Sequence, residues 1–470
     1  MAMGVRLRYL PGVSSVDATA PRLIPPGVTP PDRSLPYFHA LWKLIDNPIE
    51  AWPRAVYEDP FYQRRDERQT FLYACDPAML KDILLDKAEA FPKDWMFERV
   101  TRPALGDGLL TAHGEAWRWQ RRAAAPGFRP DNVAAMTPVI SAAADAALAR
   151  WRDLGEGARL DVSTEMTAIT FQVILDTMLS GGDGIDVPSA ARRITDYLET
   201  LGGITVADLL RWPTWTRVAL APRGHRALVA LKATVGAMVA RRRREPPRGD
   251  LVDLLMQAQD PETGRRMDDV LLRDNLLTFI GAGHETTALA LTWSLFLLGL
   301  DPATAERVRD EVTEVAGDAS LTHAHVERLV FTRQVVQEAM RLYPSLPLMS
   351  RMCAEDVEAG GLRVAKGTFV FIPIYAIHRH RRLWRDPDAF DPARFGPEES
   401  VGRHRFAYLP FGGGPRVCIG QAFALIEAVA ILATLVRGAW LEPDPGHRIR
   451  PVMRVSMRPQ GGLPMTLRLR

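Results

Sequence analysis

The most informative stretch of the sequence is Phe411-Gly412-Gly413-Gly414-Pro415-Arg416-Val417-Cys418-Ile419-Gly420, a glycine-rich turn that holds one cysteine. Residues 421–428 strongly favour helix, so Cys418 would lie where backbone N–H groups and the positive helix end favour a thiolate. We therefore predict that Cys418 is a metal ligand. An isolated cysteine beside a glycine turn would more often be a buried structural residue. Three glycines, an arginine two residues before and a glycine two residues after outweigh that alternative.

This segment resembles the haem-binding signature of the cytochrome P-450 superfamily, Phe-x-x-Gly-x-Arg-x-Cys-x-Gly, at every fixed position. The resemblance continues in the family's order over most of the chain from about residue 100, and it is weaker before that point and between about residues 180 and 270. It implies haem b as cofactor and Cys418 as the axial ligand of the iron. It also places Phe411, Arg416 and Gly420 at the cofactor. A thiolate ligand pushes electron density toward haem iron and promotes O–O cleavage.

The fold class that the pattern predicts is mainly α with small β-sheets, because helical periodicity dominates and no internal repeat is present. The resemblance implies the cytochrome P-450 fold, a single large domain with haem between a core distal helix and the cysteine loop. We expect residues 1–36 to form an extended proline-rich segment and residues 37–470 to form one haem-binding domain with no fused reductase. The expected helices are 132–154, 163–179, 189–201, 222–244, 271–300, 302–315 and 331–343, with strands near 69–73 and 362–371.

Composition limits the location and the partners of the chain. The formal charge of +3 over 470 residues does not indicate a nucleic-acid binder. Cys75, Cys353 and Cys418 are odd in number and widely spaced, which fits a reducing compartment, and we expect a cytoplasmic protein. Residues 1–36 contain no apolar run that would form a signal peptide or a transmembrane anchor. Residues 276–300 have the length of a membrane span, but the polar interruption at 281–287 favours a core helix.

Within that core helix, Ala282-Gly283-His284-Glu285-Thr286-Thr287 resembles the family's oxygen-activation motif. The resemblance implies catalytic roles for Glu285 and Thr286, because a hydroxyl backed by a carboxylate can relay protons. Ala282 and Gly283 are small enough for the backbone to approach a diatomic ligand. The alternative is a kinked apolar helix with a satisfied polar cluster. We expect His284 to face away as a structural residue.

Two further groups of residues resemble structural and cofactor-binding motifs of the family. Glu338 and Arg341 lie three residues apart on one helix face, a spacing that alone would be a weak surface ion pair. With Arg394 they resemble a buried network that locks the cysteine loop to the core. Trp117 and Arg121 repeat the family's spacing for a haem propionate. Arg351 and Arg416 are the other expected propionate partners, although lone arginines are usually solvated.

Taken together, these motifs predict a haem-thiolate monooxygenase that uses dioxygen to hydroxylate or epoxidise a hydrophobic small molecule. Electrons would come from separate proteins, a ferredoxin and its NAD(P)H-dependent reductase or a flavoprotein reductase. Arg118, Arg122, Arg403 and Arg405 could form a basic face for an acidic partner, or could be scattered solubilising residues. We expect a monomer. Two alternatives are a peroxide-driven or non-oxygenating haem-thiolate enzyme and a haem-based sensor or binding protein.

The substrate is the least determined part of the prediction. Phe279, Ala282 and Gly283 on the core helix, with Leu346 and Leu348 before the next strand, are the expected substrate contacts. Residues 209–215 are expected to form part of a lid. These residues indicate a hydrophobic ligand but do not distinguish a fatty acid from a terpenoid, a steroid or an aromatic compound. The style of the 282–287 motif is similar to that of fatty-acid hydroxylases.

Overall fold

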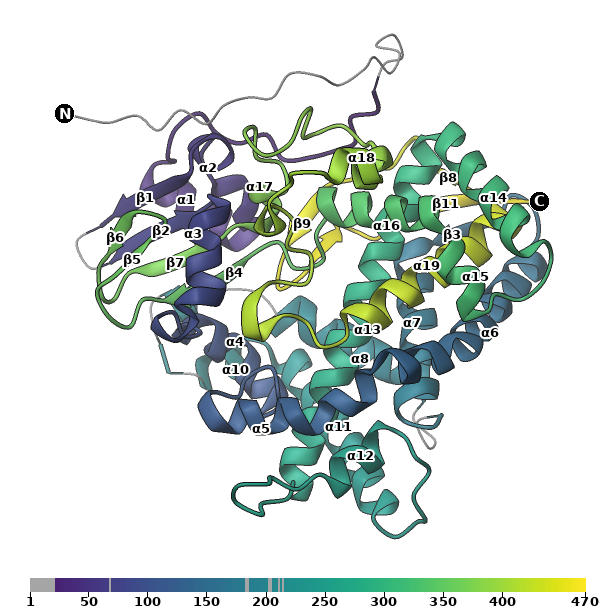
Figure 1. Cartoon of the computed structure of the whole chain (residues 1–470), viewed down its shortest axis with the longest axis horizontal. Coiled ribbons are helices and arrows are strands. Elements are labelled where there is room, and N and C mark those ends of the chain that lie inside the picture. The colour runs from purple at the N-terminus through teal and green to yellow at the C-terminus, as the bar shows by residue number, and fades with distance from the viewer. Residues whose placement is uncertain (1–21, 67–68, 182–185, 202–204, 210–211, 214) are drawn as a thin grey trace.

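The structure is a computed structural model that describes residues 22–66, 69–181, 186–201, 205–209, 212–213 and 215–470. Helices form most of it, and small sheets lie on two opposite sides of the helical body (Figure 1). The helices are α1 (Tyr37–Asp46), α2 (Ala55–Glu58), α3 (Pro77–Lys81), α4 (Trp95–Leu105), α5 (Gly114–Ala124), α6 (Pro130–Leu154), α7 (Val162–Met178), α8 (Val187–Leu201), α9 (Val206–Leu209), α10 (Trp215–Leu220), α11 (Pro222–Arg242), α12 (Leu251–Gln257), α13 (Asp269–Leu300), α14 (Pro302–Ala316), α15 (His323–Arg328), α16 (Val330–Leu342), α17 (Ile374–Ile377), α18 (Pro397–Ser400) and α19 (Gln421–Gly438).

Helix α13 runs through the core and organises the other helices. It packs against α7, α11, α16 and α19, and it is buried along most of its length because it is apolar on nearly all faces. Its start is fixed by the Asp268 carboxylate, which accepts a hydrogen bond from the backbone N–H of Leu271 at 2.8 Å. At its end, Asp301 caps α14, which begins with Pro302. The predicted core helix is therefore confirmed.

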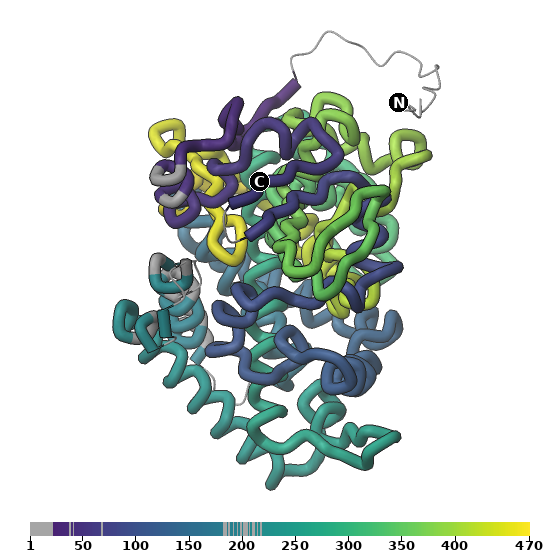
Figure 2. Tube along the Cα trace, turned by 90° about the vertical axis from the view of Figure 1, so that its left-hand side faces the viewer, coloured from purple at the N-terminus to yellow at the C-terminus, as the bar shows by residue number. Residues whose placement is uncertain are grey.

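The strands form small sheets at the edge of the helical body. One sheet has the order β1-β2-β7-β4, with β2 and β7 parallel and the other pairs antiparallel. A second sheet has the order β3-β11-β8, and β5-β6 and β9-β10 are two-stranded. Figure 2 shows early and late segments of the chain side by side, where Arg450, just before β9, pairs with Asp46 and Glu50. The strands are β1 (Phe61–Arg65), β2 (Thr70–Ala74), β3 (Arg159–Asp161), β4 (Met349–Met352), β5 (Val357–Ala359), β6 (Leu362–Val364), β7 (Phe369–Ile372), β8 (Ala439–Pro443), β9 (Pro451–Met453), β10 (Met457–Pro459) and β11 (Pro464–Leu469).

The described part of the N-terminal segment, from residue 22, is extended and lies on the core. The hydroxyl of Tyr343 donates to the carbonyl of Pro26 at 2.6 Å, and the backbone N–H of Val28 donates to the hydroxyl of Tyr375 at 3.1 Å. These contacts fix a segment that its prolines keep from forming a helix. Residues 1–21 of the predicted extended segment lie outside the described residues.

By length and composition alone, α6 and α19 could each cross a membrane, and α13 with α14 would add a third span if that pair, bent by 115°, were one unit. Helix α19, however, packs against α6, α13 and α16 in the body of the fold. Its apolar faces are therefore covered by protein. That the chain has no transmembrane anchor stays a prediction.

Candidate functional site

Two glycines allow the cysteine loop to form. Gly412 and Gly414 have φ of +73° and +69°, a region that other residues rarely adopt. A Cβ on Gly414 would lie 1.7 Å from the carbonyl oxygen of Leu84, so only glycine fits there. The loop then closes on itself, because the backbone N–H of Cys418 donates to the carbonyl of Phe411 at 3.0 Å. This turn leads Cys418 to the start of α19, as the sequence predicted.

The thiol of Cys418 is reachable by solvent although protein surrounds most of it. Burial raises its pKa, while a backbone hydrogen bond from Gly420 and the charge of Arg121 act in the opposite direction. The N–H of Gly420 at the helix end lowers the pKa of Cys418, as the sequence predicted, but burial has the larger effect in the protein alone. Desolvation of a sulfur anion outweighs one N–H group and one partly screened guanidinium. A cation at the sulfur would have to supply the missing stabilisation.

Three of the predicted propionate partners carry positive charge without a carboxylate partner. Arg121 donates to the carbonyl of Val417 at 2.7 Å and Arg416 to that of Ala112 at 2.8 Å, while Arg351 reaches the carbonyl of the residue before it. Among the described residues, no carboxylate forms an ion pair with any of these arginines, although the charge of Asp94 acts on Arg351. Burial lowers the pKa of all three, and that of Arg416 falls to about 10, with Arg351 and Arg121 adding to the effect.

Trp117 and Lys93 complete this cluster of cations. The guanidinium of Arg416 lies over the Trp117 ring, 4.3 Å from its centroid. Lys93, which sequence reasoning missed, donates to the carbonyl of Leu110. Burial, then the charges of Arg416 and Arg351, lower the pKa of Lys93 to about 7. Concentrated positive charge without an ion-paired carboxylate in the described part of the chain fits a ligand with two carboxylates, which is what a haem would provide next to Cys418.

We expect the Lys93→Met variant to lose haem faster than the wild type at about pH 7. Its rate of haem loss should also change less with pH. A propionate beside Lys93 would favour its charged form. Because its pKa in the protein alone is about 7, haem binding at higher pH must be accompanied by proton uptake. Wild-type haem loss should therefore accelerate between about pH 7 and 9. The measurement is the rate of haem transfer to an acceptor protein, and identical pH profiles for the two proteins would contradict it.

On the other side of the site, α13 presents Ala282 and Thr286. Ala282 is exposed although the helix around it is buried, so this face borders a space that solvent can enter. The Thr286 hydroxyl donates to the carbonyl of Ala282 at 2.7 Å, the back-bonding that the sequence suggested. The Ser345 hydroxyl donates to the carbonyl of Thr286 at 2.7 Å. Ser345 therefore brings the segment that carries Leu346 and Leu348 to this part of α13.

Helix α13 and the cysteine loop are joined by two aromatic side chains. The rings of Phe128 and Phe279 are 5.7 Å apart between centroids, and Phe128 also lies beside Gly420. Phe279 is thus buried toward the turn η4 (Ala125–Phe128). Phe279 therefore has a packing role in addition to the substrate contact predicted for it, which stays a prediction.

Gly283 also has a packing reason. A Cβ at this position would lie 2.6 Å from Cδ1 of Ile174 on α7, so glycine permits the close approach of α7 and α13. The sequence prediction placed Gly283 beside the ligand, and that role stays a prediction alongside this packing role. His284 is buried, with Nδ1 2.6 Å from the carbonyl oxygen of Ile280 and its ring edge-on to Phe171, which fits the structural role expected for it.

The Glu285 carboxylate is held by the β9-β10 hairpin. Ser456 donates to it at 2.5 Å, and Arg458 forms an ion pair with it. The sequence predicted a proton relay from Glu285 to Thr286, but these contacts draw the carboxylate toward the hairpin. The relay between Glu285 and Thr286 stays a prediction, and the tie between α13 and the C-terminal hairpin is a feature that the sequence did not reveal.

The structure brings Glu338, Arg341 and Arg394 together in the core. Arg341 is fully buried and meets both carboxylate oxygens of Glu338 at 2.7 Å. Its remaining N–H groups donate to the carbonyls of His378, Pro387 and Ala389. Every donor of the guanidinium therefore has a partner, as a buried charge requires. Nε of Arg394 lies 3.4 Å from the Glu338 carboxylate.

His378, which sequence reasoning missed, connects this network to the cysteine loop. Its carbonyl accepts from Arg341, and its Nε2 accepts from the backbone N–H of Leu409, two residues before Phe411, at 2.8 Å. Burial, followed by the charge of Arg341, lowers the pKa of His378 to about 3, so the ring is neutral and can accept. The network therefore reaches the loop through one imidazole.

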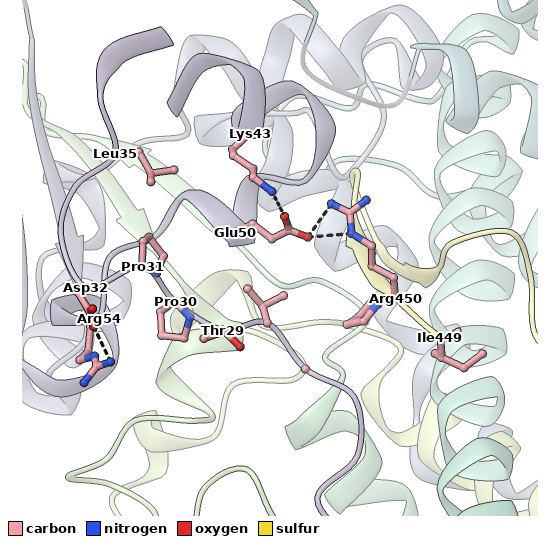
Figure 3. Close-up of a pocket in the computed structure, with 13 residues that line it drawn as sticks. Thr29, Pro30, Pro31, Asp32, Leu35, Lys43, Glu50, Arg54, Ile449 and Arg450 are labelled. Atoms are coloured by element: carbon pink, nitrogen blue, oxygen red, sulfur yellow. Dashed lines mark hydrogen bonds and ion pairs between the residues drawn. The ribbon is translucent and has the colours of Figure 1, made fainter. Parts of the chain in front are cut away.

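A separate surface cavity of about 560 Å³ lies between the N-terminal segment and the start of β9 (Figure 3). Its charged side chains are mutually paired: Glu50 is held by Lys43 and Arg450, and Arg54 pairs with Asp32. None of the predicted site residues lines it. Of the predicted lid, residues 210, 211 and 214 lie outside the described residues, and Trp212 and Trp215 are exposed.

The comparisons with known proteins identify the class. The family model for cytochrome P-450 matches residues 30–464, and the chain belongs to this family. Haem is therefore its cofactor, and the cation cluster and Cys418 are the residues suited to hold it.

Among curated proteins, the cyclooctat-9-en-7-ol 5-monooxygenase of Streptomyces melanosporofaciens is 34% identical over 79% of this chain and 80% of that protein. The cyclooctatin synthase of the same organism is 35% identical over 82% and 83%. The cytokinin hydroxylase of Arabidopsis thaliana is 32% identical over 83% and 77%. A crystal structure of the cytochrome P-450DA haem domain has a TM-score of 0.80 at 25% identity, covering 94% of this chain and 98% of that one. The chain is a cytochrome P-450 monooxygenase, and the predicted fold is confirmed.

Proposed function

We propose that this monooxygenase hydroxylates or epoxidises a hydrophobic small molecule in the cytoplasm, as a monomer, with electrons from separate redox proteins. Haem bound through a thiolate supplies the oxygen-activating chemistry. The observation that carries the proposal is the solvent-reachable face of α13, where Ala282 and the Thr286 hydroxyl interrupt an otherwise apolar, buried helix. The Ser345 hydrogen bond to the carbonyl of Thr286 joins the segment that carries Leu348 to this part of α13.

The first substrate class to test is a cyclic hydrocarbon alcohol. Two bacterial relatives are named for cyclooctat-9-en-7-ol and cyclooctatin, and they match most of the chain. Fatty acids, steroids and aromatic compounds are the comparison classes. A screen for the spectral shift that marks water displacement would rank them, and a binding preference for fatty acids would overturn the choice of a cyclic alcohol.

Electron donors are proposed to be a ferredoxin with its NAD(P)H-dependent reductase, or a flavoprotein reductase. Fewer of the four predicted arginines are available for a basic face than the sequence suggested. Arg118 is paired with Glu115 and Glu89, and Arg403 lies over the Trp384 ring and donates to main-chain carbonyls. Arg122 pairs with Asp260 at 3.7 Å, so Arg405, which lies over the Phe406 ring, is the one of the four that remains for an acidic partner among the described residues.

Substrate turnover under three conditions tests the proposed function. Product should form with NAD(P)H and the redox proteins, much less should form with peroxide alone, and none should form without NAD(P)H or peroxide. Turnover supported only by peroxide would favour the peroxygenase alternative. Haem binding with no turnover under any condition would favour a sensor or carrier.

Thr286→Ala is expected to retain haem and substrate binding while product per NAD(P)H falls and peroxide rises. The Thr286 hydroxyl lies beside Ala282, where it would transfer a proton. Losing one proton-transfer group typically slows the proton-transfer step roughly a hundredfold. Thr292→Ala is the matched control, because Thr292 makes the same back-bond, to Ala288 at 2.7 Å, in a buried turn. Equal coupling in both variants would show that Thr286 only shapes the helix.

A further inference from the structure

A chain of buried side-chain amides joins α13 to α5. Asn275 on α13 is 1% exposed, and Gln120 on α5 is 2% exposed. The backbone N–H of Leu109 donates to Oδ1 of Asn275, and Nδ2 of Asn275 donates to Oε1 of Gln120, both at 3.0 Å. Nε2 of Gln120 then donates to the carbonyl of Asp107 at 3.0 Å. The two amides and the loop between α4 and α5 therefore form one closed ring of hydrogen bonds.

Only one orientation of the two amides satisfies this ring. A backbone N–H can only donate and a backbone carbonyl can only accept, so Leu109 fixes Oδ1 of Asn275 and Asp107 fixes Nε2 of Gln120. Nδ2 of Asn275 also donates to the carbonyl of Leu271 at 3.0 Å. Each nitrogen and oxygen of both side chains therefore has a partner. Removing one amide would leave buried polar groups unpaired, which is costly.

Helix α5 needs this constraint because apolar burial fixes it only weakly. Of its 11 residues, those that are buried are Trp119, Gln120 and Ala124. Consecutive side chains on a helix point about 100° apart, so the direction of Gln120 sets that of Arg121. Arg121 donates to the carbonyl of Val417 in the cysteine loop at 2.7 Å. Two consecutive residues of α5 thus tie it to α13 on one side and to the cysteine loop on the other.

We propose that Asn275 is a positioning residue for the haem. Through the amide of Gln120, it holds α5 at the rotation that lets Arg121 pair with a haem propionate. Asn275 acts through α5 and not by contact with the cofactor. The inference depends on haem as the cofactor but not on the substrate or the electron donor. It therefore goes beyond the proposed function, and it can fail while that function stands.

The first experiment records the environment of the propionates by resonance Raman spectroscopy of the haem-loaded protein. Asn275→Leu removes the acceptor for Leu109 and the donor to Gln120 while it keeps a side chain of similar size. Gln120→Met breaks the ring from the α5 side, and it keeps the inference testable if the leucine variant fails to fold. The propionate bending bands should shift in both variants. Wild-type band positions in either variant would overturn the proposal.

The second experiment separates positioning from a general loss of stability by measuring the rate of haem transfer to an acceptor protein. In the wild-type background, Arg121→Ala should accelerate haem loss by about tenfold or more, because a hydrogen bond to a charged group is lost. In the Asn275→Leu background, the same substitution should have a much smaller effect, because the guanidinium is already displaced. A purely structural role would make the two effects additive. Equal acceleration in both backgrounds would overturn the inference, as would wild-type haem loss in Arg121→Ala.

Asn47→Leu provides the control, because Asn47 is also a fully buried asparagine that joins distant parts of the chain. Its Nδ2 donates to the carbonyl of Pro451, and its Oδ1 accepts from the N–H of Met453, both on β9 at 3.0 Å. This variant should melt at a lower temperature than the wild type, yet keep the wild-type propionate bands and the full effect of Arg121→Ala. A band shift in Asn47→Leu equal to that in Asn275→Leu would overturn the inference, because the loss of any buried asparagine would then suffice.

Discussion

Replacing Cys418 with alanine is expected to abolish the red-shifted absorption band of the reduced protein with carbon monoxide, and with it all turnover. The sulfur is the only side-chain donor that the 411–420 loop directs to the start of α19, and the cations around it provide no alternative ligand. The measurement is the reduced carbon monoxide difference spectrum of matched haem-loaded preparations.

Cys75→Ala and Cys353→Ala are the controls. Both thiols are buried and point to main-chain carbonyls, Cys75 to that of Val56 at 3.2 Å and Cys353 to that of Glu355 at 3.0 Å. Each variant should keep the band. A Cys418→Ala protein that retained it, or a Cys75→Ala or Cys353→Ala protein that lost it, would reassign the iron ligand.

Glu338→Ala or Arg341→Ala is expected to prevent stable haem incorporation. Removing one member of a fully buried pair leaves the other charge without its partner, at a cost of about 3 to 5 kcal/mol. The damage should reach the cysteine loop, because His378 links Arg341 to Leu409. Haem content and melting temperature are the measurements.

Arg363→Ala provides the comparison for this prediction. Arg363 pairs with Asp356 at 2.9 Å, but its side chain is 82% exposed, and exposed pairs contribute little. This variant should match the wild type. Wild-type haem content and melting temperature in Glu338→Ala or Arg341→Ala would show that the network does not lock the fold.

The local patterns of the chain predict much of the fold. The long apolar helix expected over 271–300 is α13, Asp269–Leu300, and that expected over 302–315 is α14, Pro302–Ala316. The ends of the strands were harder to predict. The single strand region expected over 362–371 forms two short strands in different sheets, β6 and β7. Sequence periodicity does not show which partner a short strand pairs with.

Site residues were predictable where a sequence motif fixes their spacing. They were less predictable where contacts between distant parts of the chain determine their role. Cys418, Arg341 and Arg416 could be singled out from motifs in the sequence. Lys93 could not be singled out, because a single lysine becomes notable only through its position beside Arg351 and Arg416 in the folded chain. Likewise, the partners of Glu285 come from a hairpin about 170 residues away in sequence, which the adjacent threonine does not indicate.

The most direct test of the central claim is turnover with isotopically labelled dioxygen, purified redox proteins and NAD(P)H, followed by mass spectrometry of the product. A monooxygenase places one labelled oxygen atom in each product molecule, and Cys418→Ala should place none. Product with unlabelled oxygen, or labelled product formed equally by Cys418→Ala, would contradict the assignment of this chain as a haem-thiolate monooxygenase acting through Cys418.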